Sequence, residues 1–208
     1  MKDDFLTTGR VALDLLRAPE VAASWDKPSA LPEFSVAGLA AHLAYQVVFV
    51  PDVLDAPRPS EETVPLLEHY ARSAWVGADL DAAVNVGIRE GSERAAEEGR
   101  DALAARLEAA LGTLSGRDFD GGRPVRFPFW GPWSLSLDDL LVTRMMEMVV
   151  HADDLAVSAG VPTPEFPPRV VGPVVDLLAR LSVRRHGATA VIRALTRAER
   201  SPGLINAF

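Results

Sequence analysis

Four ionisable residues stand at helical spacing within a strongly apolar stretch of the chain. Arg144, Glu147, His151 and Asp154 are separated by 3, 4 and 3 residues. At ~100° per residue they fall within a stripe of about 80° on one face of a helix. The remainder of residues 137–159 is apolar on nearly every side, which predicts burial. A buried polar stripe must be compensated by mutual pairing, by water in a cavity or by a metal ion.

Binding of a metal ion is the most specific of these three hypotheses. Glu147 and His151 lie one helical turn apart and can both reach a point beside the helix. His42 is the natural third ligand, because its helix is otherwise apolar around it and Gln46 lies one turn away on the same face. A set of two histidines and one glutamate leaves a fourth position open, as in catalytic rather than structural zinc sites. Asp154 can accept the second N–H of His151 or bond a neighbouring side chain.

The same residues also fit a protein without a metal. His42 alone would then be a hydrogen-bonded core histidine, and Glu147 with His151 a simple i,i+4 pair, with Arg144 neutralising the carboxylate. The spacing by itself leaves this alternative open.

The elements that must position these residues are helices. The chain has 208 residues, is 48% hydrophobic and is dominated by Ala, Leu, Arg and Glu, which predicts an all-α protein with one substantial core. We interpret His69 and His186, which stand among charged residues, as exposed or helix-end histidines outside the site. One short strand is predicted at Thr189 to Leu195. The expected helices cover residues 5–24, 36–50, 60–75, 95–116, 136–160 and 168–187, with 76–92 left unassigned.

A long connection separates the helices that carry the candidate ligands. Residues 116–133 are rich in Gly, Pro and aromatic residues, which predicts a long loop or a short extended crossover in a four-helix bundle. We expect residues 1–187 to form the bundle and 188–208 a short C-terminal extension. The aromatic run at 127–133 is predicted to plug one end of the bundle. The candidate pocket residues are Gln46, Phe129, Trp130 and Trp133.

Composition excludes several classes of protein. The formal net charge is −8, and the 21 Lys and Arg residues are interleaved with acids, which argues against a nucleic-acid partner. The absence of cysteine removes disulfides, thiolate metal sites and a protein thiol nucleophile. The N-terminus is charged and no run approaches 18 uncharged apolar residues, so we expect a cytoplasmic monomer or homodimer with no membrane partner.

Three segments resemble the mycothiol-dependent maleylpyruvate isomerase family, which belongs to the DinB-like four-helix bundles. They are residues 25–29 (WDKPS), 39–43 (LAAHL) and 143–155 (TRMMEMVVHADDL). The similarity runs in order from the N-terminus to about Gly187, and the Arg-x-x-Glu-x-x-x-His-x-x-Asp string is its most specific part. The resemblance places the family's divalent-metal ligands on His42, Glu147 and His151, and its accompanying catalytic residues on Arg144 and Asp154.

The resemblance also implies a chemistry. Such a protein would be an actinobacterial enzyme that binds a divalent metal, with zinc expected, and uses the low-molecular-weight thiol mycothiol as cofactor or co-substrate. The lack of cysteine fits a borrowed thiol. A thiol on zinc is deprotonated near neutral pH and adds to an electrophilic small molecule. Loss of the thiol after rotation gives cis–trans isomerisation, and retention of the adduct gives S-transfer.

One departure from the family bears on the substrate. The isomerase carries a further α/β C-terminal domain, whereas only 22 residues follow His186 here. A mycothiol S-transferase therefore fits the sequence at least as well as an isomerase does. The hypothesis from a different class is a non-catalytic bundle that binds a metal or a small ligand without turnover.

Overall fold

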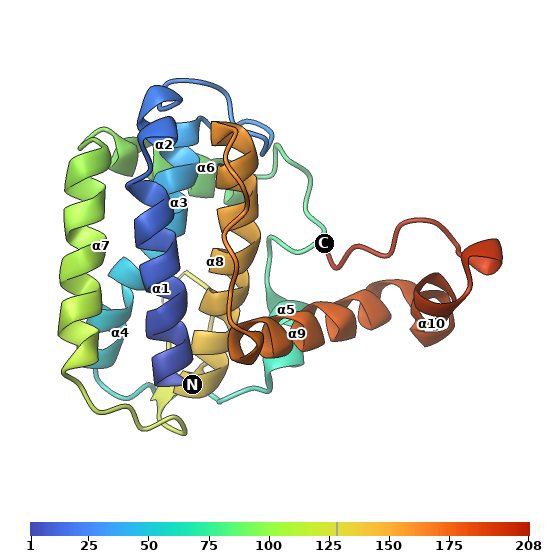
Figure 1. Ribbon diagram of the computed structural model, residues 1–208. Coiled ribbons are helices and arrows are strands. Elements are labelled where there is room, and N and C mark those ends of the chain that lie inside the picture. The colour runs from blue at the N-terminus through green and yellow to red at the C-terminus, as the bar shows by residue number, and fades with distance from the viewer. Residues whose placement is uncertain (128) are drawn as a thin grey trace.

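A computed structural model describes residues 1–127 and 129–208 and shows a helical bundle in which α3 and α7 run antiparallel to α1 and α8 (Figure 1). In its body, α1 and α3 each pack against both α7 and α8, so the four helices enclose one core (Figure 1). This arrangement confirms the predicted all-α, four-helix-bundle fold class. The four helices are α1 (Lys2–Leu16), α3 (Val36–Val48), α7 (Arg100–Ser115) and α8 (Leu137–Ala159).

Shorter elements link and cover the four helices. The helix α6 packs along α3, and a two-stranded antiparallel hairpin, with Pro124 opposite Ser136 and Val125 opposite Leu135, lies at the start of α8. These elements are α2 (Pro19–Ala23), α4 (Val50–Asp55), α5 (Leu66–Arg72), α6 (Ala83–Ala96), β1 (Pro124–Val125) and β2 (Leu135–Ser136).

Local sequence signals set the ends of the two helices that matter most for the site. Ser35 caps α3 by accepting a hydrogen bond from the Gly38 N–H, and Ser136 caps α8 by accepting one from Asp139. Gly160 ends α8 in the left-handed conformation at φ 73°. The bounds of α8 agree with the helix predicted over residues 136–160. After α3 the chain restarts as α4, with Pro51 in its first turn.

The core runs along the inner faces of these helices. On α8, Leu141, Met145 and Met148 have no exposed surface. Truncating one such buried aliphatic side chain to alanine typically costs about 2–5 kcal/mol. Each helix of the body is therefore fixed by packing, and the polar stripe of α8 is held in a rigid frame.

Three predicted helices are shorter or interrupted. The helix expected over 60–75 begins only at Leu66, because Thr63 pairs with Ser134 in an isolated bridge and Pro65 is extended at ψ 151°. The helix expected over 95–116 is cut where Gly99 takes φ 86°, and its first residues belong to α6. The helix expected over 5–24 breaks before Pro19.

The C-terminal segment corrects one prediction. Residues Thr189 to Leu195, expected as a strand, lie in the helix α10 (Ala188–Thr196). Good helix formers alternate with the β-branched residues there, and Val191 is buried while Ile192 is 60% exposed, as on a one-sided helix. The preceding α9 (Pro168–His186) has the predicted bounds, and a short 3-10 helix, η1 (Ala198–Arg200), follows α10.

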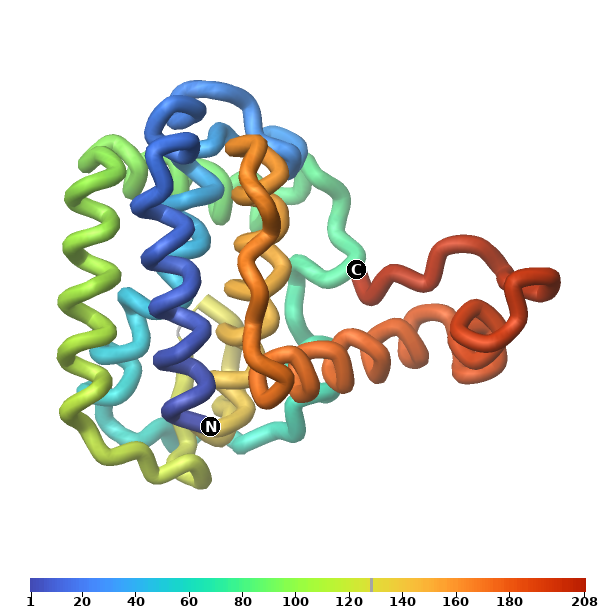
Figure 2. Tube along the Cα trace, in the orientation of Figure 1, coloured from blue at the N-terminus to red at the C-terminus, as the bar shows by residue number. Residues whose placement is uncertain are grey.

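Helices α9 and α10 extend away from the bundle, and the chain then turns back toward it (Figure 2). By length and composition Val36–Asp55 would pass as a membrane-spanning helix. However, 72% of its apolar window is buried inside the protein, as is usual for the core helix of a soluble bundle.

Candidate metal centre

The contact between α3 and α8 brings the three predicted ligands together. His42 lies in the middle of α3, next to the fully buried Leu39 and Leu43. Glu147 and His151 face it from successive turns of α8. One ligand atom from each of the three residues lies within 4.8 Å of the others.

The distances between these atoms suit one small cation. His151 Nε2 lies 3.1 Å from Glu147 Oε2, and His42 Nε2 lies 4.0 Å from the same oxygen. Zinc with bonds of about 2.0–2.1 Å in tetrahedral geometry separates its ligand atoms by about 3.3 Å. A nitrogen, nitrogen and oxygen donor set of this spacing fits a divalent ion such as zinc with small side-chain adjustments.

The far nitrogen of each imidazole has a hydrogen-bond partner. His151 Nδ1 lies 3.0 Å from Asp154 Oδ2, which is one of the two partners considered for Asp154 from the sequence. His42 Nδ1 lies 3.4 Å from Ser92 Oγ on α6, whose own proton goes to the Ile88 carbonyl. Because the Ser92 hydroxyl proton is used in this way, its oxygen accepts from His42 Nδ1–H. Both rings therefore turn Nε2 toward Glu147, the arrangement that metal-binding histidines require.

Arg144 and Gln46 form the next layer of the site. The Arg144 guanidinium donates to Gln46 Oε1 and, at 3.0 Å, to Thr143 Oγ1. Its Nη2 lies 4.0 Å from Glu147 Oε1. The Gln46 amide nitrogen donates to the His42 carbonyl at 2.9 Å and lies 3.3 Å from His42 Nε2. This amide therefore contacts the lone pair that a cation would take, so binding requires Gln46 to shift.

Electrostatics favour an ionised carboxylate next to a neutral imidazole. Burial lowers the pKa of His42 below its ordinary value, and the nearby Glu147 carboxylate, which favours the charged ring, only partly offsets this. Burial opposes ionisation of Glu147, but the hydrogen bond with His151, the neighbouring His42 and the charge of Arg144 hold its pKa well below the usual range. Burial lowers the pKa of His151, yet Asp154 and Glu147 outweigh it and raise that pKa to about 9. A cation must therefore displace one proton, from His151.

Aromatic rings line the site on the Arg144 side. The Arg144 guanidinium carbon lies 5.9 Å from the Phe49 ring and 6.0 Å from the Trp130 ring. Phe127 packs between them, with ring centroids 4.6 Å from Phe49 and 5.7 Å from Trp130. Aromatic rings around a guanidinium attract its positive charge and reduce its contact with water. A site of this kind can bind a small ligand that is partly apolar and partly negatively charged.

The other predicted pocket residues occupy different environments. Phe129 is 84% exposed and touches Phe127 edge to face at 5.2 Å. Trp133 is 6% exposed and packs with Val64 and Leu135 in a small cluster of its own, away from the surface. Pro128, which also belongs to the aromatic run at 127–133, lies outside the described residues.

His69 corrects a sequence interpretation. It lies in the last turn of α5, one of the two places expected, but it is not exposed: its exposed fraction is 2%, and its Nδ1 accepts a hydrogen bond of 3.1 Å from the Trp133 indole N–H. Its ring contacts Trp130 at a centroid distance of 4.6 Å, and Trp130 in turn contacts Arg144. Burial, with help from the Arg144 charge, lowers the pKa of His69 to about 4, so the ring is neutral with its proton on Nε2. His186 is partly exposed and bonds the Asn206 carbonyl.

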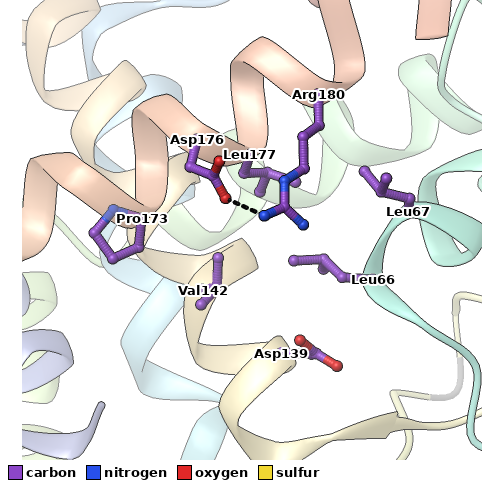
Figure 3. A pocket seen from close by; sticks show the side chains of 8 residues that line it. All are labelled: Leu66, Leu67, Asp139, Val142, Pro173, Asp176, Leu177 and Arg180. Atoms are coloured by element: carbon purple, nitrogen blue, oxygen red, sulfur yellow. Dashed lines mark ion pairs between the residues drawn. The ribbon is translucent and has the colours of Figure 1, made fainter. Parts of the chain in front are cut away.

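A separate cleft of about 210 Å³ lies where α9 leaves the bundle (Figure 3). It is lined by Leu66 and Leu67 of α5, by Asp139 and Val142 of α8, and by α9 residues that include the Asp176–Arg180 ion pair at 2.8 Å. None of the three candidate ligands lines it. The metal centre and this cleft are therefore different places on α8.

Fold and site together define a class, the helical bundles with a histidine and carboxylate cluster between two core helices. Within that class the chain belongs to the family described as mycothiol maleylpyruvate isomerase N-terminal domain, whose model matches residues 6–156. The match spans α1 to most of α8 and includes His42, Glu147 and His151. No curated protein and no solved structure was found to match. The predicted family is confirmed, and it connects the chain with mycothiol-dependent isomerase chemistry.

Proposed function

We propose that this protein is a cytoplasmic, zinc-dependent enzyme that activates a low-molecular-weight thiol, mycothiol, for addition to an electrophilic small molecule. The observation that carries the proposal is the meeting of His42, Glu147 and His151 around one point in a chain without cysteine. Three protein ligands leave room for an external one, and the sulfur has to come from outside. Membership of a family named for mycothiol supports mycothiol as that thiol.

The side chains of the site would have three different roles. His42, Glu147 and His151 would hold the ion, while Ser92 and Asp154 keep the two imidazoles in the binding tautomer. A bound zinc ion would supply Lewis acidity that lowers the pKa of a thiol into the neutral range. Arg144, fixed by Gln46 and Thr143, would stabilise negative charge that develops on the electrophile.

The chemical step forms one carbon–sulfur bond. The thiol sulfur donates its electron pair to the electrophilic carbon, and its proton leaves to solvent. In S-transfer a leaving group departs with the bonding pair or the neighbouring carbon takes up a proton. In isomerisation the carbon–sulfur bond breaks after rotation and the thiol is returned. The aromatic wall of Phe49, Phe127 and Trp130 offers an apolar surface for a planar electrophile in either case.

Metal analysis of the purified protein tests the first half of the proposal. We expect about one zinc per chain in the wild type and its loss in His42→Ala and His151→Ala. His186→Ala is the matched control, since this partly exposed histidine bonds only the C-terminal tail, and it should keep the metal. An empty wild type, or ligand variants with an unchanged metal content, would refute the metal centre.

A thiol-conjugation assay tests the second half. The zinc-loaded protein is incubated with a bimane or dinitrophenyl electrophile and with mycothiol, cysteine or glutathione in turn. We expect rates above background with mycothiol, lost in Glu147→Gln. Metal binding without any rate across the three thiols would favour the non-catalytic binding protein instead.

A further inference from the structure

The C-terminal arm, residues 168–208, has little support from the body of its own chain. At its start α9 packs on the bundle through the buried Val170, Val174 and Leu177. Beyond this point α9 and α10 stand away from the bundle (Figures 1 and 2). The tail returns, and Phe208 packs on Trp75 with ring centroids 4.9 Å apart. Between these two anchors, α10 packs only against α9 and η1 among its principal partners within the described residues.

Large apolar side chains are exposed along the free part of the arm. Val191 is buried, whereas Ile192 is 60% and Leu195 70% exposed on the same short helix, three residues apart. Val183 on α9 and Leu204 in the tail are also exposed, at 39% and 87%. Exposed apolar residues scattered singly are normal, but several on one projecting element mark an interaction surface.

The arm also carries a charge opposite to that of the body. It holds seven arginines against two acidic residues, a formal charge of +5, whereas residues 1–167 hold 14 basic against 27 acidic residues, a charge of −13. The even mixing of charges seen over the whole chain thus fails in the arm. Arg184, Arg185, Arg193 and Arg197 make no ion pair with any described residue.

A complementary surface exists on the body. Asp79 and Asp81 lie in the segment before α6 and likewise make no ion pair among the described residues. Leu80, between these two aspartates, is 55% exposed, and Ile88 on α6 is 38% exposed. Unpaired carboxylates beside exposed aliphatic side chains match the arginines and aliphatic residues of α10 in chemistry.

We infer that the arm is a dimerisation element that docks on residues 79–88 of a second copy of this chain. In a two-fold arrangement each arm reaches the body of the other, so the same pair of surfaces is used twice. The occupant is a second copy rather than an anionic membrane, because the body, at −13, would be repelled by such a surface but supplies acidic counter-charge to the partner's arm.

Light scattering coupled to size exclusion tests this inference on the full chain. We expect a dimer at low ionic strength that dissociates more readily as salt is added. The double substitution Ile192→Glu and Leu195→Glu should weaken the dimer at least tenfold while the far-UV spectrum is unchanged. Val157→Glu, at a 60% exposed apolar residue near the end of α8, is the matched control and should leave the dimer intact.

Charge-reversal variants give a second test, because a misfolded variant would not recover the dimer when the opposite charge is also reversed. Arg184→Glu with Arg185→Glu should dissociate the dimer, and so should Asp79→Arg with Asp81→Arg. The four changes combined should restore it, because opposite charges again face each other. A monomeric wild type, or a dimer that the variants leave unchanged, overturns the inference. So does cosedimentation of a monomer with phosphatidylglycerol vesicles that is lost in the arginine variant. No outcome involves metal or thiol, so the result is independent of the proposed function.

Discussion

At the scale of single residues, two histidines near the site have their tautomers fixed by one neighbour each. His42 donates from Nδ1 to Ser92, and His69 accepts at Nδ1 from the Trp133 indole. The same ring atom thus has opposite roles, so the two rings present different groups at Nε2. His42 offers a lone pair, which suits a metal, and His69 offers an N–H, which suits an acceptor oxygen.

The Ser92 contact predicts a specific loss of metal affinity. Ser92→Ala should weaken zinc binding about tenfold to a hundredfold, because the His42 ring loses the partner that holds it. The affinity is measured by competition with a chromophoric chelator. Ser115→Ala removes a similar hydroxyl bond to the carbonyl four residues earlier, at Leu111, and should leave the affinity unchanged. Equal affinities in Ser92→Ala and the wild type would argue that the Ser92 contact does not position His42.

His69 predicts a pH dependence of stability. Its pKa in the folded protein, about 4, lies below the ordinary 6.5, so folding favours the neutral ring. The stabilisation is therefore present above pH 6.5 and is lost as the pH falls toward 4. By linkage this one group should remove about 2 kcal/mol of unfolding free energy between pH 7 and pH 5. In urea titrations at both pH values, His69→Gln should lose that part of the pH dependence, and an unchanged difference would contradict the assignment.

At the scale of elements, α6 clamps the start of the ligand-bearing helix α3. The Glu93 carboxylate accepts from the Ser35 backbone N–H at 2.9 Å and from the Ser35 hydroxyl at 2.7 Å. Gly38 lies against this carboxylate, and a Cβ there would fall 2.2 Å from Glu93 Oε1. Because α6 also carries Ser92, the clamp holds both His42 and its hydrogen-bond partner in register.

This clamp predicts opposite effects for two glycine-to-alanine substitutions in helices. Gly38→Ala should destabilise the protein by about 1–2 kcal/mol, because the Glu93 carboxylate must leave two charge-assisted hydrogen bonds. Gly112→Ala, on α7 with open space around it, should stabilise by up to about 1 kcal/mol through helix propensity alone. Denaturant unfolding measures both, and a stabilised Gly38→Ala would show that the clamp contributes little.

At the scale of the whole molecule, the candidate site joins two of the four core helices. His42 belongs to α3, near the start of the chain, whereas Glu147 and His151 belong to α8, more than a hundred residues later. An ion bound there would cross-link the two helices in the folded state only. Metal binding and global stability are therefore linked.

That linkage predicts a rise in melting temperature with zinc. At a free zinc concentration a hundredfold above Kd, the folded state gains about 2.7 kcal/mol, which raises Tm by roughly 5–10 °C for a chain of this size. Thermal unfolding is followed with zinc and with a chelator in turn. His151→Ala should show no zinc-dependent shift in Tm. A wild-type Tm that is the same with zinc and with the chelator would exclude the site.

Periodic features of this protein can be predicted from its amino-acid sequence alone. The helix periodicity of residues 137–159, the capping serine and the terminal glycine predicted α8 closely, and i,i+3 and i,i+4 spacing sufficed to put Glu147, His151 and Asp154 on one face. The apolar surroundings of His42 made it a candidate third ligand, and the family resemblance placed a ligand there. These features depend on neighbours within a turn or two of helix, which are readable from the chain alone.

Contacts between side chains that are distant in the sequence became apparent from the folded structure. Nothing near Ser92, in the charged stretch of α6, marked it as the partner of His42, and the charged neighbours of His69 concealed a ring buried under Trp130 and Trp133. The aliphatic residues of α10 read as a strand, because β-branched residues in a short segment fit either structure until packing on α9 selects one face. Contacts between elements depend on how the helices pack across the core. The spacing of residues within one helix does not predict that packing.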